Sequence, residues 1–170
     1  MDARRRATVG PVGCGLCGID SLEQAARPLP QVPKTQACLS VAEVAQALEE
    51  LRSVQPLHDE TRAVHAAGFY LPGRGIILAR EDVGRHNALD KLIGAMQRAD
   101  VDVSEGAIVL TSRVSVEMVQ KTVMAGCAIL VAVSAPTAHA VRLAQDAGLT
   151  VTSGARGTPR IYTHSTRIKE

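Results

Sequence analysis

The feature that most constrains this fold is a repeated pairing of a short apolar run with a helical segment. Residues 75–80, 107–111 and 128–133 are apolar at nearly every position, and each run is followed by a stretch with helical periodicity. A strand that is continuously apolar, instead of alternating, is buried on both of its faces. Strand–helix repetition with such strands predicts an α/β domain, built as a three-layer α/β/α sandwich with a mainly parallel sheet.

Local signals place the individual elements. Ser40 and Glu43 have the spacing of a capping box, which predicts a helix that begins there and ends near Leu51. Pro72 and Gly73 predict a turn. Helices are expected over residues 21–27, 40–51, 61–67, 85–98, 115–125 and 137–147. Strands are expected over residues 75–80, 107–111, 128–133, 149–153 and 160–163.

Length and composition suit a single domain with an aliphatic core. The chain has 170 residues, of which 46% are hydrophobic but only 2% aromatic. So few rings argue against base stacking on a single-stranded nucleic acid, and a net charge of +2 is too weak for a polyanionic partner. Glycine and proline interrupt the first part of the chain. We therefore expect a mobile leading segment over residues 1–39 and the α/β domain over residues 40–170.

The sequence also carries signals about the compartment. No apolar run approaches the roughly 20 residues of a membrane span, and the arginine-rich start does not resemble a signal peptide. Four cysteines in a chain of this length are too few for a disulfide scaffold. We expect a cytoplasmic protein with no membrane association, in which paired cysteines serve chemistry or metal binding.

Two strand-to-helix turns carry the candidate ligand residues, because open α/β sheets bind ligands beyond the carboxyl ends of their strands. The first turn contributes Asp82, Gly84, Arg85, His86 and Asn87, and the second Ser112, Arg113, Ser115 and Glu117. Arginine forks and backbone N–H groups at helix starts suit phosphate or carboxylate. A plain polar helix N-terminus remains an alternative for the first turn, and Ser115 is expected to cap its helix in either case. Neither GxGxxG nor GxxxxGK[ST] occurs.

The cysteine pair in GPVGCGLCGID, Cys14 and Cys17, is open to three interpretations: a redox disulfide, part of a metal site, or a sulfur carrier. Structural zinc usually needs four ligands, and this chain has only one such pair. Cys38 and Cys127 stand alone, although zinc bound by Cys14, Cys17, Cys38 and a histidine is an alternative. The flanking glycines favour a mobile thiol pair, as a carrier requires, which gives a carrier without a metal of its own a preference over the other two interpretations and leaves them open.

Five motifs together carry a resemblance to a known family. CGLCG, REDVGRHNALDK, TSRVSVEMVQK, SAPTAHAV and YTH follow one another from Cys14 to His164. In this order they resemble the FdhD family of formate dehydrogenase accessory sulfurtransferases. The long second motif is the most specific of the five. The resemblance also implies a longer segment ahead of the cysteine motif than the thirteen residues present here.

The resemblance implies a function and a set of partners. A persulfide on Cys14, assisted by Cys17, would pass sulfur from a cysteine desulfurase to the molybdenum cofactor, in its bis-molybdopterin guanine dinucleotide form, for formate dehydrogenase. The family also implies a homodimer and a cytidine-deaminase-like core. The deaminase zinc centre itself is not expected, because His65-Ala66-Ala67 lacks the catalytic glutamate.

The nucleotide pocket that the family implies falls on the two turns. Arg85, Arg113 and Ser112 are expected to hold phosphate, and Asp82 or Glu117 to read guanine, with GDP as a mimic of the cofactor. His86 is expected either to donate to phosphate or to cap its helix. The alternative function is a non-catalytic guanine-nucleotide or cofactor-binding module whose cysteine pair binds metal.

Overall fold

A six-stranded sheet forms the centre of the molecule. The computed structural model describes residues 29–154 and 159–170. The sheet has the order β3-β2-β4-β5-β6-β7. Its strands are β2 (His65–Leu71), β3 (Gly75–Asp82), β4 (Ala107–Leu110), β5 (Ile129–Ala132), β6 (Thr150–Ser153) and β7 (Arg160–Thr163).

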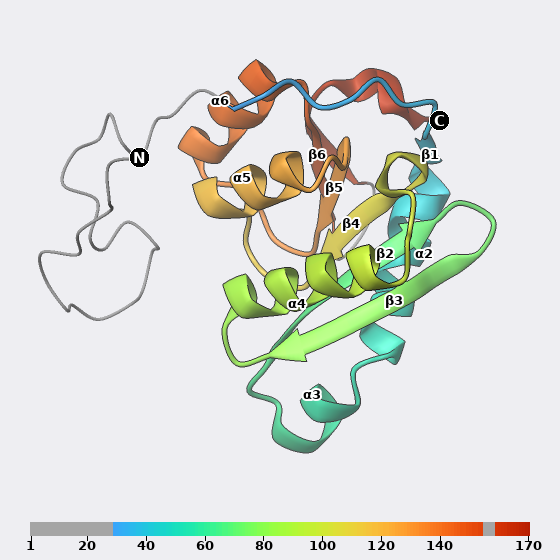
Figure 1. Cartoon of the computed structure of the whole chain (residues 1–170), viewed down its shortest axis with the longest axis vertical. Coiled ribbons are helices and arrows are strands. Elements are labelled where there is room, and N and C mark those ends of the chain that lie inside the picture. The colour runs from blue at the N-terminus through green and yellow to red at the C-terminus, as the bar shows by residue number, and fades with distance from the viewer. Residues whose placement is uncertain (1–28, 155–158) are drawn as a thin grey trace, which may run out of the picture.

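Helices cover both faces of this sheet (Figure 1). One face carries α2 (Val41–Ser53), and the other carries α4 (Arg85–Arg98), α5 (Val116–Met124) and α6 (Ala138–Ala147). The short α3 (Pro56–Thr61) lies at one end of the molecule, and none of its residues is buried. Two short 3-10 helices are η1 (Val103–Glu105) and η2 (Ser165–Arg167), and β1 (Leu39–Ser40) pairs with β8 (Ile168–Lys169). The expected three-layer α/β/α sandwich is therefore confirmed.

The expectation of a mainly parallel sheet is wrong. Only the pairings β4–β5 and β5–β6 are parallel, whereas β2–β3, β2–β4 and β6–β7 are antiparallel. The cause lies in the connections. A parallel neighbour needs a crossover of a dozen or more residues, but β2 reaches β3 through the expected turn at Pro72 and Gly73.

The helix expected over residues 61–67 is also wrong. The chain there forms the end of α3 and then the strand β2. Ala66 and Ala67 favour a helix locally, but residues 66–70 are all buried between β3 and β4, where a strand satisfies their backbone groups. Packing is close, because a Cβ at Gly68 would lie 2.8 Å from Cδ1 of Leu51 in α2.

Two aliphatic cores result, one on each face of the sheet. Phe69 packs towards α4, α5 and α6, and Tyr70 packs towards α2. These two adjacent aromatic side chains therefore lie in different cores. Cys127 lies fully buried in the first core, as its apolar surroundings in the sequence suggest. Burial raises the pKa of the Cys127 thiol to about 11, which leaves it protonated and unreactive.

The packed part of the chain begins before the expected boundary at residue 40. Val32 donates its N–H to the carbonyl of Ala147 at 2.9 Å, and the Thr35 hydroxyl donates to the carbonyl of Ser104. Residues 1–28, with the helix expected over 21–27, lie outside the described residues. No helix in the described ranges has the length and apolar character that crossing a membrane requires.

Close packing between β2 and the start of β4 predicts the effect of a glycine substitution. A Cβ at Gly106 would clash with the carbonyl oxygen of Tyr70 and lie 2.6 Å from Cζ of Phe69. We expect Gly106→Ala to lower the free energy of unfolding by about 2 kcal/mol or more, because the clash is with backbone. Urea unfolding followed by circular dichroism measures it.

Gly94→Ala in α4 is the matched control, because the nearest atom to its Cβ would be Nη1 of Arg98 at 3.5 Å. Alanine replaces glycine in a helix there, so we expect a gain of about 0.5–1 kcal/mol. Equal effects of the two substitutions would contradict this account of the packing.

Candidate ligand-binding site

The first predicted turn is organised around Asp82, the last residue of β3. Its Oδ1 accepts hydrogen bonds from the Gly84 N–H at 2.9 Å and from Nδ2 of Asn87 at 3.1 Å, and its Oδ2 forms an ion pair with Lys91. Hydrogen bonds from Lys91, Gly84 and Asn87 lower the pKa of Asp82 to about 2. The contacts of the Asp82 carboxylate are thus with its own turn and with the helix that follows, and they stabilise the turn.

The second predicted turn is tied to the first by His86 and Glu117. Nε2 of His86, in α4, lies 2.8 Å from Oε2 of Glu117, in α5. Ser115 occupies the N-cap position of α5, but its hydroxyl donates to Glu117 at 3.4 Å and accepts no hydrogen bond from a backbone N–H of the helix. His86 likewise makes no cap, because the N-cap of α4 is Gly84. The structure therefore brings these predicted residues together but replaces the expected caps with one hydrogen-bonded cluster.

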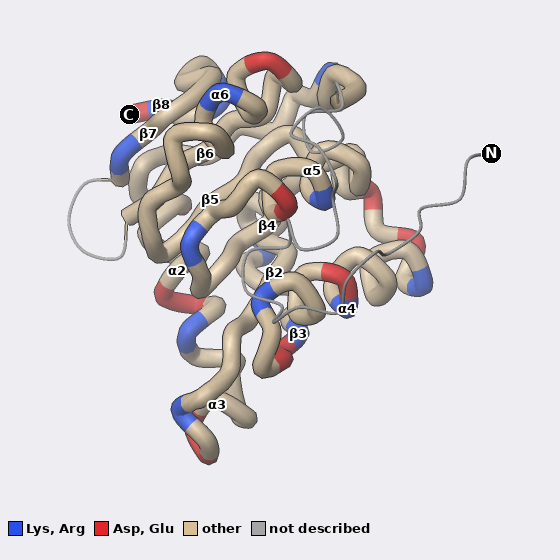
Figure 2. Tube along the Cα trace, turned by 90° about the vertical axis from the view of Figure 1, so that its left-hand side faces the viewer, with Lys and Arg blue, Asp and Glu red and all other residues tan. Residues whose placement is uncertain are grey.

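The other predicted residues of the turns differ in exposure. Ser112 is buried, and its hydroxyl donates to the carbonyl of Arg113 at 3.1 Å. Arg113 itself is exposed, whereas Arg85 is partly buried and lies near His65. Charged residues of both signs lie along α3, the end of β3 and α4 (Figure 2). Arg113 is accordingly the predicted anion-binding side chain most open to a ligand.

A cavity of about 960 Å³ lies at the edge of the sheet where the two predicted turns begin. Thr111, Val133 and Gly154, each the residue after a strand of the parallel set, form one wall. The cavity thus lies beyond the carboxyl ends of the strands, where the sequence predicts a ligand. Its lining comprises Ala45, Leu48, Glu49, Arg52, Gln55, His58, Arg62, Ala63, Val64, His65, Thr111, Val133 and Gly154.

None of the nine residues predicted on the two turns lines this cavity. The turns lead into α4 and α5, on one face of the sheet, whereas the cavity opens towards α2 and α3 on the other face. Sequence reasoning missed the α2 and α3 residues because no local signal shows which helix covers which face. His65 was missed as well, because residues 61–67 were expected to form a helix, and only the structure makes His65 the first residue of a strand antiparallel to β4.

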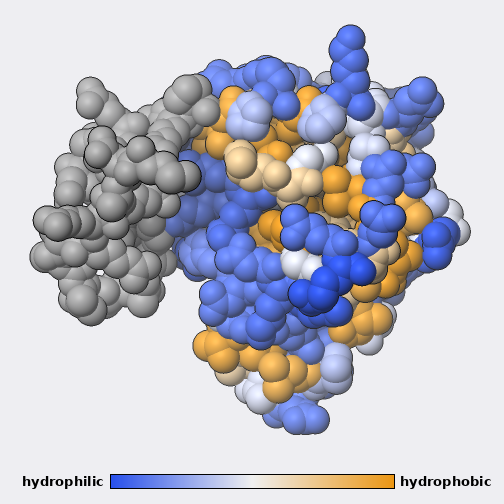
Figure 3. Space-filling model, viewed as in Figure 1, coloured by the Kyte–Doolittle hydropathy of each residue, from blue (hydrophilic) through white to orange (hydrophobic). Residues whose placement is uncertain are grey.

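The α3 wall of the cavity is fastened by β3. The Glu81 carboxylate accepts the backbone N–H of Leu57 at 2.9 Å and that of His58 at 2.8 Å. Arg52 of α2 adds an ion pair to Asp59 of α3 at 2.9 Å. Apolar surface remains exposed near α3 at the lower end of the molecule, where Leu57 is 41% exposed (Figure 3).

The catalytic candidates Cys14 and Cys17 lie outside the described residues. Cys38 is partly exposed and Cys127 is buried. Within residues 29–154 and 159–170, no three His, Cys, Asp or Glu side chains are grouped as metal ligands would be.

Comparison with known proteins gives a family. The model of the FdhD/NarQ family matches residues 1–169. The chain belongs to the FdhD/NarQ family. The resemblance of its five motifs to this family is therefore confirmed, and the match includes the CGLCG motif and both predicted turns.

Relatives within the family are close. Sulfur carrier protein FdhD of Agrobacterium fabrum is 50% identical over 169 residues, which are 99% of this chain and 62% of that protein. Sulfur carrier protein FdhD of Bordetella bronchiseptica is 51% identical over 169 residues, 99% of this chain and 61% of that one. The chain thus spans about three fifths of the length of these curated relatives.

A solved structure has the same fold. A crystal structure described as a formate dehydrogenase accessory protein from Desulfotalea psychrophila superposes with a TM-score of 0.74 at 29% identity. The match covers 81% of this chain and 60% of that one. The α/β architecture is therefore shared within the family.

The bonding of Asp82 predicts a loss of stability in acid. Its pKa is about 2 in the folded protein against 3.8 without these contacts, so its contribution is full above 3.8 and is lost as the pH falls through about 2. We expect Asp82→Asn to lower the free energy of unfolding near neutral pH by about 1–2 kcal/mol, allowing for solvent screening. Urea unfolding between neutral pH and pH about 2 should show the difference shrinking in acid.

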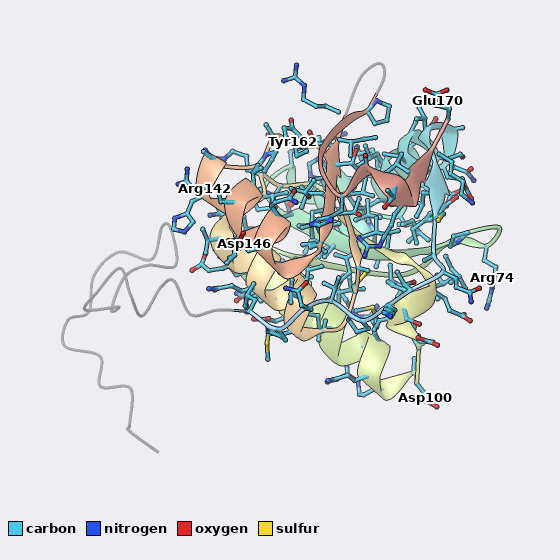
Figure 4. All side chains as sticks on the ribbon, turned by 90° about the horizontal axis from the view of Figure 1, so that it is seen from above. Arg74, Asp100, Arg142, Asp146, Tyr162 and Glu170 are labelled. Atoms are coloured by element: carbon cyan, nitrogen blue, oxygen red, sulfur yellow. The ribbon has the colours of Figure 1, made fainter. Side chains whose placement is uncertain are left out.

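Asp146→Asn is the control, because Asp146 projects from α6 at the surface (Figure 4). It should change stability little. A difference between Asp82→Asn and wild type that persisted unchanged in acid would contradict the assignment.

Proposed function

We propose that this chain is a sulfur carrier that serves formate dehydrogenase. In this proposal it receives persulfide sulfur from a cysteine desulfurase and delivers it to the molybdenum cofactor, as bis-molybdopterin guanine dinucleotide, before that enzyme is activated. The observation that carries the proposal is the family match over residues 1–169, with relatives at about 50% identity named sulfur carrier protein FdhD. A homodimer, as the motifs imply, is part of the proposal.

The chemistry of the carrier is a sulfur exchange at Cys14. Its thiolate attacks the outer sulfur of the donor's persulfide, and the donor cysteine leaves as a thiolate. Cys14 then carries the persulfide, and no electrons are gained or lost overall. Cys17, two residues on, assists the onward release by thiol exchange. Cys127 is unsuited to this role, because its thiol is buried and its pKa is raised.

The cofactor is the acceptor of the sulfur, and we place it at the carboxyl edge of the sheet. The exposed Arg113 is placed to bind phosphate oxygens there, together with N–H groups at the helix starts, and Arg85 adds a positive charge at the start of α4. The carboxylates of Asp82 and Glu117 already accept hydrogen bonds from neighbouring side chains, which argues against either as the reader of guanine. The cavity of about 960 Å³ offers the volume for the ring system.

The carrier role predicts persulfide formation. After incubation with a cysteine desulfurase and cysteine, the full chain should gain the mass of a sulfur atom on Cys14, because its thiolate is the nucleophile. Cys14→Ala should abolish the gain, and Cys38→Ala, which changes a cysteine outside the motif, should leave it intact. Mass spectrometry under non-reducing conditions measures both. Persistent labelling of Cys14→Ala would remove the assignment, and stoichiometric zinc in anaerobically purified protein would favour the metal-binding module.

The nucleotide site predicts a preference for guanine. GDP should bind more tightly than ADP by calorimetry, and Arg113→Ala should weaken GDP binding roughly tenfold through the loss of a charge-assisted contact. Arg142→Ala removes an equal charge from the surface of α6, away from the cavity lining, and should bind GDP as the wild type does (Figure 4). Equal affinities for the two nucleotides would show that the pocket does not read guanine.

A further inference from the structure

His65 lies between the first predicted turn and the cavity. It is the first residue of β2, which runs antiparallel to β4, so its backbone lies at the carboxyl edge of the parallel strands. It pairs with Asp82 of the predicted turn across β2 and β3, and its side chain lines the cavity beside Thr111. No other residue of β2 reaches the cavity.

The imidazole of His65 makes no hydrogen bond to any described residue. Three of the other four histidines have such a partner, and the fourth, His139, is exposed on α6. His58 places Nδ1 3.3 Å from the carbonyl of Val64, His86 bonds to Glu117, and His164 places Nε2 2.9 Å from the carbonyl of Gln145. A partly buried polar ring without a partner in residues 29–154 and 159–170 is open to hydrogen bonds from water or a ligand.

The groups around His65 favour the uncharged form of its ring. Burial, the Arg85 guanidinium of α4 and His58 of α3 lower its pKa below 6.5, in that order of importance. The cavity adds Glu49 and Arg52 from α2 and Arg62 from the end of α3, and the opposite residue on β3, Asp82, is already paired with Lys91. An uncharged imidazole has one nitrogen that accepts a hydrogen bond and one that donates.

We propose that the imidazole of His65 accepts a hydrogen bond from a ring N–H of the nucleotide whose base lies in the α2–α3 cavity. This inference rests on the proposed function, which supplies a guanine nucleotide as the ligand. Guanine carries an N–H in its six-membered ring, whereas adenine has an acceptor at that position. The exposed Arg113 holds the phosphates, and His65 selects the base.

The expected consequence is that GDP binding weakens as His65 becomes protonated. Calorimetry with GDP on the full chain, from about pH 8 to about pH 5, should show a loss of affinity in acid, because the protonated ring has no acceptor. His65→Gln keeps an acceptor but does not titrate. It should bind within a few-fold of wild type at the upper end of this range and lack the part of the pH dependence that belongs to His65. His65→Leu should lose roughly tenfold in affinity.

Two controls separate the outcomes. The terminal phosphate of GDP also titrates, but equally for every variant, and His139→Gln changes an exposed histidine of α6 outside the cavity. Wild-type affinity in His65→Leu, with GDP still bound and preferred over ADP, would overturn the role of His65 and leave the proposed function standing. Failure of the wild type itself to bind GDP would overturn the nucleotide part of the proposed function, and this inference with it.

Discussion

The pairing of β2 between β3 and β4 is the constraint on which the other features depend. Residues 66–70 are buried on both faces, with Phe69 in one core and Tyr70 in the other. The approach is so close that neither Gly68 nor Gly106 leaves room for a Cβ. Because β2 runs antiparallel to its neighbours, it delivers His65 to the edge where the parallel strands end.

That edge has two sides with different physical character. Towards α4 and α5, the charged groups satisfy one another, as the Asp82–Lys91 and His86–Glu117 pairs illustrate. Such a network rigidifies the turns and fixes the directions of their backbone N–H groups. Towards α2 and α3, the edge opens into a cavity lined by both apolar and polar residues, His65 among them. A ligand with a flat ring and an anionic end suits the two sides together.

A sulfur carrier needs a reactive thiol and an acceptor held in place. Burial and the raised pKa of its thiol make Cys127 unsuited to that role, and the proposal places the thiol chemistry on the CGLCG motif, which lies within the family match. The acceptor side calls for rigidity, and the fold supplies it through Glu81, which fastens α3 to β3, and Asp82, which fastens the following turn. Two adjacent carboxylates of one strand thus hold α3, which walls the cavity, and the turn that leads into α4.

The sequence by itself determined the elements whose signals are local. The Ser40–Glu43 capping box starts α2, apolar runs form β4 and β5, and Gly148, with φ +76°, ends α6. It also placed both turns directly after strands, at the edge where a ligand is predicted. Only the tertiary structure decided that residues 65–71 form a strand. The alanines of this segment favour a helix locally, and their pairing partners in β4 lie some forty residues further along the chain. The position of the cavity likewise depends on the tertiary structure alone. Its lining comes from α2, α3 and the ends of four strands, which meet only when the sheet has formed.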